Sequence, residues 1–152
     1  MNAQEFLSRP YRANLRLEKA YLKAAALQSL TERVTARFGR ESEPVSHSVN
    51  CTAMQDAIAR LVEAKEEAER LKDELAAVEL ETGMVLARLS DETLYEFMVK
   101  RFLDLKSTRA AAEEMSYSDG WGRWEARRGV EEVQRILDEM EAAGDCPCLP
   151  GI

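Results

Sequence analysis

The sequence predicts an all-α protein: a long antiparallel helical hairpin, coiled-coil-like in pattern, followed by a small C-terminal helix-turn-helix unit. Over long stretches the apolar residues recur at alternating spacings of three and four, which is typical of packed helices. The period-two alternation of β-strands is absent. The 152 residues include only 7 glycines and 4 prolines, so long helices can continue without interruption.

The longest regular pattern covers residues 54–89. It contains one glycine, Gly83, and no proline. At 1.5 Å per residue this helix would be about 50 Å long. Its apolar or small positions are Met54, Ala57, Leu61, Ala64, Ala68, Leu71, Leu75, Val78, Thr82, Val85 and Leu89.

Residues 13–38 show the same heptad rhythm and predict the first helix of the hairpin. We expect Pro10 to limit its extension towards the N-terminus unless the proline lies in the first turn. Residues 39–52 form the predicted connector, in which Gly39 ends the first helix and Asn50 or Thr52 caps the second. The apolar positions are Ala13, Leu17, Ala20, Ala24, Leu27, Thr31, Val34 and Phe38, and Leu22 and Leu30 widen the stripe.

The charge is divided along the chain in a way that favours this pairing. The net charge is −7, with +5 in residues 1–40 and −9 in residues 41–99. Exposed ion pairs contribute only about 0–1 kcal/mol each, so the charges indicate a partner more than they add stability. Two helices alone bury little surface, and we expect residues 1–89 to form a homodimer or to pack on the C-terminal helices. Contact of the basic first helix with nucleic acid is the less favoured alternative.

Residues 90–141 predict three further helices. Ser90 or Asp91 caps the first, Ser107 or Thr108 caps a short alanine-rich second, and residues 116–118 form a tight turn before the third. This order is a helix-turn-helix layout. Because the two helices of the motif cross at a sharp angle, a small residue is needed at the contact. The expected contributors are Leu94, Phe97, Met98, Arg101, Phe102 and Leu105 in the first helix, Ala111 or Ala112 at the crossing, Met115 with Tyr117 beside it under the turn, and Val130, Val133, Leu137 and Met140 in the last helix.

The stretch "LYEFMVKRFLDLKSTRAAAEEMSYSDGWGRWEARRGVEEVQRIL" resembles the last helix-turn-helix of bacterial sigma factors. It is still more similar to small transcriptional regulators of the ArpU/RinA type, which phages and prophages encode. The opening "AQEFLSRPYRANLRLEK" and the middle segment "PVSHSV" extend the resemblance over about residues 3–137. Its most specific parts are Arg101-Phe102-Leu103 and residues 111–118.

The resemblance implies a cytoplasmic regulator of phage transcription that binds double-stranded DNA and has no enzymatic activity. It implies that Ser118 begins the recognition helix and that Lys106, Thr108 and Arg109 reach backbone phosphate. The residues implied to lie in or near the groove are Asp119, Gly120, Arg123, Trp124, Arg127 and Arg128. Host RNA polymerase is a second implied partner.

The chain departs from the family pattern in the recognition helix, where Gly122 and Glu125 occupy positions that usually hold apolar residues. One hypothesis is a change of helical register at residues 119–122, which would let Trp121 and Trp124 fill both core positions while Gly122 and Gly129 absorb the mismatch. The alternative is that both tryptophans stay exposed and contact DNA or protein.

Other features predict little chemistry. Cys51, Cys146 and Cys148 are expected to be reduced surface thiols, and His47 a solvated residue of the connector. The residues show no nucleophile with its base, no phosphate-binding glycine loop and no cluster of metal ligands, so we expect no enzyme, metal or cofactor. We expect a flexible tail over residues 142–152 and no membrane segment. The main alternative function is a protein-interaction module, either an RNA polymerase-binding adaptor or a small-terminase-like assembly protein.

Overall fold

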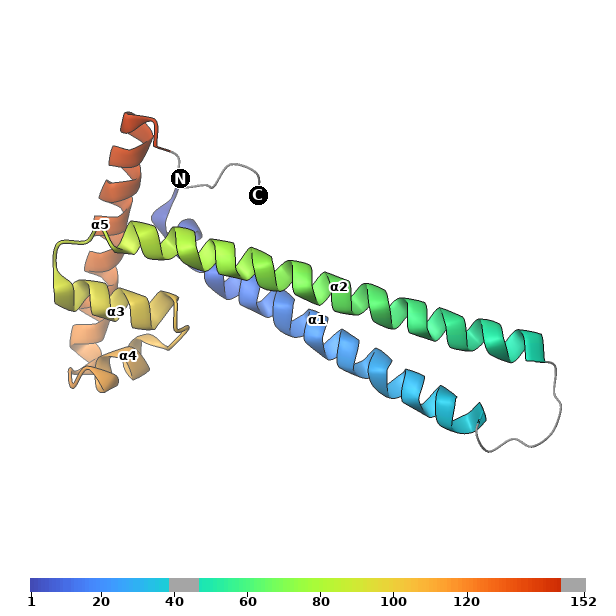
Figure 1. The fold of residues 1–152 in the computed structure, drawn as a ribbon. Helices are drawn as coiled ribbons and strands as arrows, with labels where there is room; N and C mark the ends of the chain where they lie inside the picture. The colour runs from blue at the N-terminus through green and yellow to red at the C-terminus, as the bar shows by residue number, and fades with distance from the viewer. Residues whose placement is uncertain (39–46, 146–152) are drawn as a thin grey trace. The chain divides into compact units, whose positions relative to one another are not determined.

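The computed structural model describes residues 1–38 and 47–145, and within these ranges the regular structure is entirely helical. This confirms the predicted all-α fold, with a long helical hairpin followed by a helix-turn-helix (Figure 1). The helices are α1 (Ala3–Phe38), α2 (His47–Leu86), α3 (Glu92–Phe102), α4 (Thr108–Glu114) and α5 (Asp119–Ala143).

The chain divides by contacts into two compact units. The hairpin unit is Leu15–Asp73, and the core unit combines Met1–Asn14 with the chain from Glu74 onward. The sequence had instead suggested one domain over 1–89 and another over 90–141. The ends of both long helices therefore belong with the helix-turn-helix.

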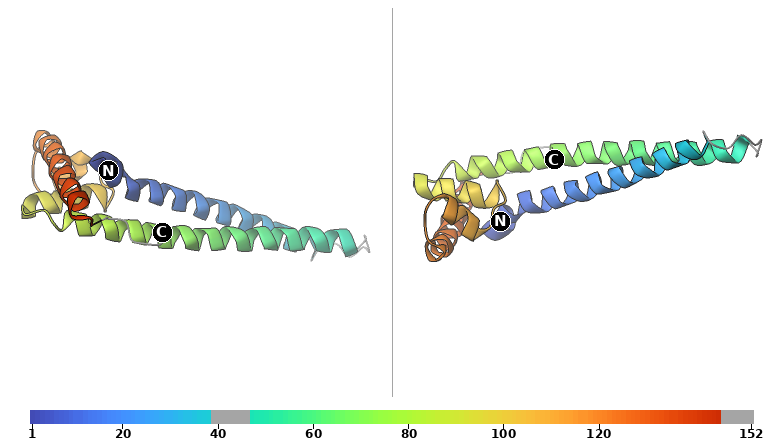
Figure 2. Two further views of the ribbon diagram at one scale, coloured as in Figure 1. Left: turned by 90° about the horizontal axis from the view of Figure 1, so that it is seen from above. Right: turned by 90° about the horizontal axis from the view of Figure 1, so that it is seen from below.

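In the hairpin unit α1 and α2 run antiparallel, side by side in every view (Figure 2). The residues buried between them are Leu17, Ala20, Leu61, Ala64, Ala68 and Leu71, all at positions that the heptad rhythm predicts. Three of the six are alanines, so the interface between the helices is narrow.

The predicted start of α1 was wrong, because the helix begins at Ala3 and contains Pro10 in its interior. A proline inside a helix removes one hydrogen bond and costs about 3 kcal/mol or more. The first turns tolerate it because Phe6, Leu7 and Pro10 are buried in the core unit. The Ala3 N–H also donates to Oε1 of Gln134, at 2.8 Å, which ties the start of α1 to α5.

The predicted start of α2 was also wrong. The helix begins at His47, so Asn50 and Thr52 lie within it and are not its caps, and it ends at Leu86. His47 is therefore a helical residue. The predicted exposure of the His47 and Cys51 side chains, like everything predicted for Cys146 and Cys148, lies outside the described residues.

The core unit buries its apolar side chains from all five helices. α3, α4 and α5 contact one another, and the ends of α1 and α2 add to the same cluster. An ion pair of 2.8 Å between Arg9 and the buried Glu81 joins α1 to α2 here. The buried members are Ala3, Phe6, Leu7, Val85, Leu86, Leu94, Phe97, Met98, Ala111, Ala112, Val133, Ile136, Leu137 and Met140.

Capping residues fix where the three C-terminal helices begin. The side chains of Asp91, Ser107 and Ser118 accept hydrogen bonds from backbone N–H groups of α3, α4 and α5, respectively. Asp91 and Ser107 were each one of two predicted caps, whereas Ser118 had been implied by the resemblance to begin the last helix and instead caps it. α5 ends at Ala143, where Gly144 adopts φ +75°, so the helix extends past the predicted start of the tail at residue 142. Among the described residues, no helix is long and apolar enough to cross a membrane.

Candidate nucleic-acid interface

The helix-turn-helix depends on a close crossing of α4 and α5. A Cβ atom placed on Gly122 would lie 2.9 Å from Cβ of Ala112 and 3.2 Å from the carbonyl oxygen of Thr108. Both Ala111 and Ala112 are fully buried, which confirms the prediction of small residues at this contact. Gly122 therefore lets α5 approach the backbone of α4.

The turn between α4 and α5 uses one residue in the left-handed region. Ser116 has φ +65°, and the following Tyr117 N–H donates to the carbonyl oxygen of Ala112, at 2.8 Å. Ser118 then caps α5 by accepting a hydrogen bond from the Trp121 N–H, at 3.2 Å. The predicted tight turn at residues 116–118 is confirmed.

The hypothesis of a register change was wrong, because α5 is continuous from Asp119. Gly122 and Glu125 stay on its buried face, and Glu125 is only 1 % exposed. Gly129 likewise faces the buried Met98, where a Cβ atom would overlap the thioether. The two glycines thus allow close packing of helices and do not absorb a mismatch.

Arg128 forms an ion pair with the buried carboxylate of Glu125. Its Nη2 atom lies 2.8 Å from Oε1 of Glu125 and 2.5 Å from Oδ2 of Asp91, the N-cap of α3. These hydrogen bonds, first that to Asp91 and then that to Glu125, raise the pKa of Arg128 above its ordinary value. Arg128, which the resemblance places among the DNA contacts, therefore joins α5 to α3.

The two tryptophans have different environments. Trp121 is half-buried, stacked on Tyr117 at 3.9 Å between ring centroids and edge-on to Phe97 at 5.5 Å. Trp124 is 56 % exposed, and the guanidinium of Arg128 lies 5.2 Å from the centre of its ring. Trp121 therefore packs against the core without any shift of register, whereas Trp124 is exposed and its contact with DNA or protein stays a prediction.

The outward face of α5 presents the other predicted contacts. Ser118, Asp119, Gly120, Arg123 and Arg127 are all exposed. Arg123 pairs with Asp119 at 3.3 Å, whereas no carboxylate of the described chain lies within ion-pair distance of Arg127. A Cβ atom on Gly120 would touch nothing within 4 Å.

The predicted phosphate contacts of α4 are mostly engaged within the chain. Lys106 pairs with Glu114, and the exposed Arg109 pairs with Glu113 at 3.0 Å. Oγ1 of Thr108 accepts a hydrogen bond from Nε of Arg101, at 3.2 Å. Lys106 and then Lys100 hold the pKa of Glu114 below its usual range.

Two contributors to the site were missed from the sequence. Arg101 was assigned only to the apolar face of its helix, yet it also donates to the carbonyl oxygen of Lys106, at 3.1 Å, and so holds the connection between α3 and α4. Asp91 was expected only to cap α3, and its bond to Arg128 spans 37 residues. Two residues so far apart leave no pattern in the sequence that predicts their pairing. The Arg109–Glu113 and Asp119–Arg123 pairs, by contrast, could be predicted from their spacing of four residues.

Comparison with known proteins found no matching family model, no similar curated protein and no similar solved structure. Within residues 1–38 and 47–145, no group of three or more His, Cys, Asp or Glu side chains is arranged to hold a metal ion.

Proposed function

We propose that the chain binds double-stranded DNA, with α5 as the helix that enters the major groove. One observation carries this proposal: α4 and the turn at Ser116 support an α5 whose outward face exposes Gly120, Arg123, Trp124 and Arg127. The first residues of a recognition helix make the base contacts in such motifs. An arginine there can donate two hydrogen bonds to guanine, and an exposed indole adds an apolar contact.

The ion pairs of the core unit predict modest affinity. Within residues 100–128, five of the seven basic side chains pair with carboxylates, leaving Arg101, which is bonded to its own chain, and Arg127. Pairs as exposed as Arg109–Glu113 are weak and can exchange a carboxylate for a phosphate. We therefore expect binding that is detectable at low salt and lost steeply as salt rises.

A mobility-shift assay at low salt tests this proposal with three forms of the full chain. The probe is duplex DNA from the promoter region of phage late genes. Arg127→Ala should weaken binding about tenfold or more. Arg135→Ala is the matched control, because Arg135 is an exposed arginine later in α5 that pairs with Glu132 and Glu139. No retarded band with excess wild-type protein, or equal losses in both variants, would contradict the proposal.

The resemblance to ArpU/RinA-type regulators supports the finer proposal of a phage or prophage transcriptional regulator in the bacterial cytoplasm. The order of the helices and the capped turn are compatible with that class. A reporter gene under a phage late promoter, with and without the protein, measures the effect. An unchanged reporter at every promoter to which the protein binds would contradict regulation without contradicting DNA binding.

A second candidate function is a protein-interaction module that binds RNA polymerase or assembles in the manner of a small terminase subunit. The neutralised cations and the exposed aromatic rings of Tyr95, Tyr117 and Trp124 favour it. Purified bacterial RNA polymerase that binds the chain without DNA, with loss in Trp124→Ala, would support the adaptor. A ring-sized native mass would support the terminase-like reading.

A further inference from the structure

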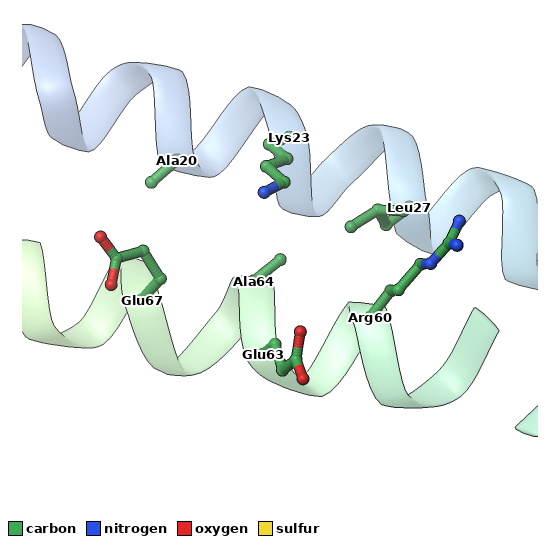
Figure 3. A pocket seen from close by; sticks show the side chains of 7 residues that line it. All are labelled: Ala20, Lys23, Leu27, Arg60, Glu63, Ala64 and Glu67. Carbon is green, nitrogen blue, oxygen red and sulfur yellow. The ribbon is translucent and has the colours of Figure 1, made fainter. Parts of the chain in front are cut away.

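Charged side chains gather both in the hairpin unit and beside α5, but in different surroundings. In the hairpin unit they border a depression of about 560 Å³ between α1 and α2, as Figure 3 shows for Lys23, Arg60, Glu63 and Glu67. All four are exposed, and water competes with exposed charges, so such a cluster does little to order its members. Beside α5, by contrast, the guanidinium of Arg128 is anchored in the core unit and lies against an exposed aromatic ring.

The anchor of Arg128 consists of two carboxylates that different helices hold in place. Its Nη2 atom donates hydrogen bonds to Oε1 of Glu125 and Oδ2 of Asp91. Asp91 is itself fixed, because its Oδ1 atom accepts hydrogen bonds from the N–H groups of Thr93 and Leu94 at the start of α3. Glu125 is fixed by its burial within α5. The packing of α3 on α5 therefore determines where the guanidinium lies.

The exposed ring is the indole of Trp124, one helical turn before Arg128. The centre of the ring lies 5.2 Å from Cζ of Arg128. The Nε atom of Arg128 is buried, and it has no hydrogen-bond partner within residues 1–38 and 47–145. The face of an aromatic ring attracts a cation, and the attraction is stronger where the cation is shielded from water. The anchored guanidinium therefore favours the conformation of Trp124 in which the ring stays over it.

We propose that Arg128 is a positioning residue: together with Asp91, it holds the indole of Trp124 in one orientation on the outward face of α5. The purpose of this order rests on the DNA binding proposed above, whereas the order itself is a property of the free protein. A ring that is already ordered contacts DNA without first losing rotamer freedom, which lowers the entropic cost of binding. Arg128 acts on DNA through Trp124, and its own guanidinium, shared between two carboxylates, makes no phosphate contact.

The variants must remove the cation without leaving a buried carboxylate unpaired. Glu125→Leu serves as the background, because it removes the buried charge while Arg128 keeps its ion pair with Asp91. In this background Arg128→Met deletes the positive charge and keeps an unbranched side chain. Arg127→Met in the same background is the matched control, since it removes the same charge from the neighbouring exposed position of α5. Circular dichroism checks that all variants keep their helix content.

Fluorescence of the free full-length chain measures the order of the ring. Trp121→Phe in every form leaves Trp124 as the only tryptophan, because the chain has two. After Arg128→Met we expect a lower anisotropy of Trp124 and a rate of quenching by acrylamide that is at least about twofold higher. Arg127→Met should change neither. Equal anisotropy and quenching in Arg128→Met and in the background, or equal effects of Arg127→Met and Arg128→Met, would overturn the proposal.

The mobility-shift assay at low salt then tests the link to DNA, in the Glu125→Leu background with Trp121 retained. Arg128→Met and Trp124→Ala should each weaken binding, and both changes together should weaken it no more than Trp124→Ala alone. The salt dependence should be the same with and without Arg128→Met. Additive losses, or a slope reduced by about one, would overturn the proposal, because Arg128 would then contact DNA directly. If no form of the chain binds the duplex, the proposed DNA binding fails, and the fluorescence alone decides whether Arg128 orders Trp124.

Discussion

At the scale of single residues, two glycines near the start of α5 have opposite roles. Gly122→Ala should destabilise the protein by about 1–3 kcal/mol, because its Cβ atom would press on Ala112 and on the backbone of Thr108. Gly120→Ala should stabilise it by about 0.5–1 kcal/mol, since its Cβ atom meets nothing and alanine favours the helix. Chemical denaturation of both variants measures this difference. A Gly122→Ala protein as stable as Gly120→Ala would contradict the close crossing.

Glu125 and Arg128 form the second residue-scale feature, a carboxylate buried in the core beside its cation. Arg128→Ala should destabilise the protein by about 1–3 kcal/mol, because it leaves the 1 % exposed Glu125 without its donor. Glu125→Leu should be close to neutral or stabilising, because it removes a buried charge while Arg128, which is partly exposed, keeps its ion pair with Asp91. Chemical denaturation gives the free energy of unfolding of both variants. Equal losses of stability in Arg128→Ala and Glu125→Leu would show that the pair itself stabilises the fold.

At the scale of the helices, Asp91 connects the start of α3 to α5 and makes stability depend on pH. The hydrogen bond from Arg128, followed by that from the Leu94 N–H, holds the pKa of Asp91 below its usual range. The pKa of Asp91 is therefore lower in the folded protein than in the unfolded chain, where it is about 4. The charged carboxylate stabilises the fold fully above about pH 4, and this stabilisation is lost as the pH falls through the folded-state pKa.

Asp91→Asn isolates this contribution, because asparagine still caps a helix but does not titrate. Unfolding measured from about pH 7 down to pH 2 should show a smaller loss of stability in the variant than in the wild type. Glu114 remains in both proteins as an internal control, since its pKa is also lowered, by Lys106 and Lys100. Identical pH profiles would mean that the bond to Arg128 does not persist in solution.

The sequence predicts a helix well where the residues that determine it are close together in the chain. The heptad rhythm, the caps Asp91 and Ser107 and the alanines of α4 act within a few residues, and the structure confirms them. The start of α1 at Ala3 was missed because Pro10 is tolerated only through burial among distant helices. The continuous α5 was missed for a similar reason: Glu125 occupies a core position because its carboxylate pairs with Arg128, which the distant Asp91 also binds.

At the scale of the whole molecule, the number of copies that bind together decides how strongly a helix-turn-helix with few free cations holds DNA. One such unit should bind weakly, and an assembly that carries two of them binds as one bivalent ligand if both reach the DNA. Sedimentation of the full chain with and without the duplex measures how many copies bind together.

The salt dependence of binding measures the phosphate contacts. The logarithm of the affinity falls with the logarithm of salt concentration by about 0.9 per phosphate neutralised. Arg127→Ala should reduce this slope by about one for each copy bound, if Arg127 touches phosphate, without changing the mass of the protein. Arg135→Ala serves again as the control, because Arg135 pairs with Glu132 and Glu139 and should leave both mass and slope unchanged. Equal slopes for Arg127→Ala and the wild type would show that Arg127 does not contact phosphate.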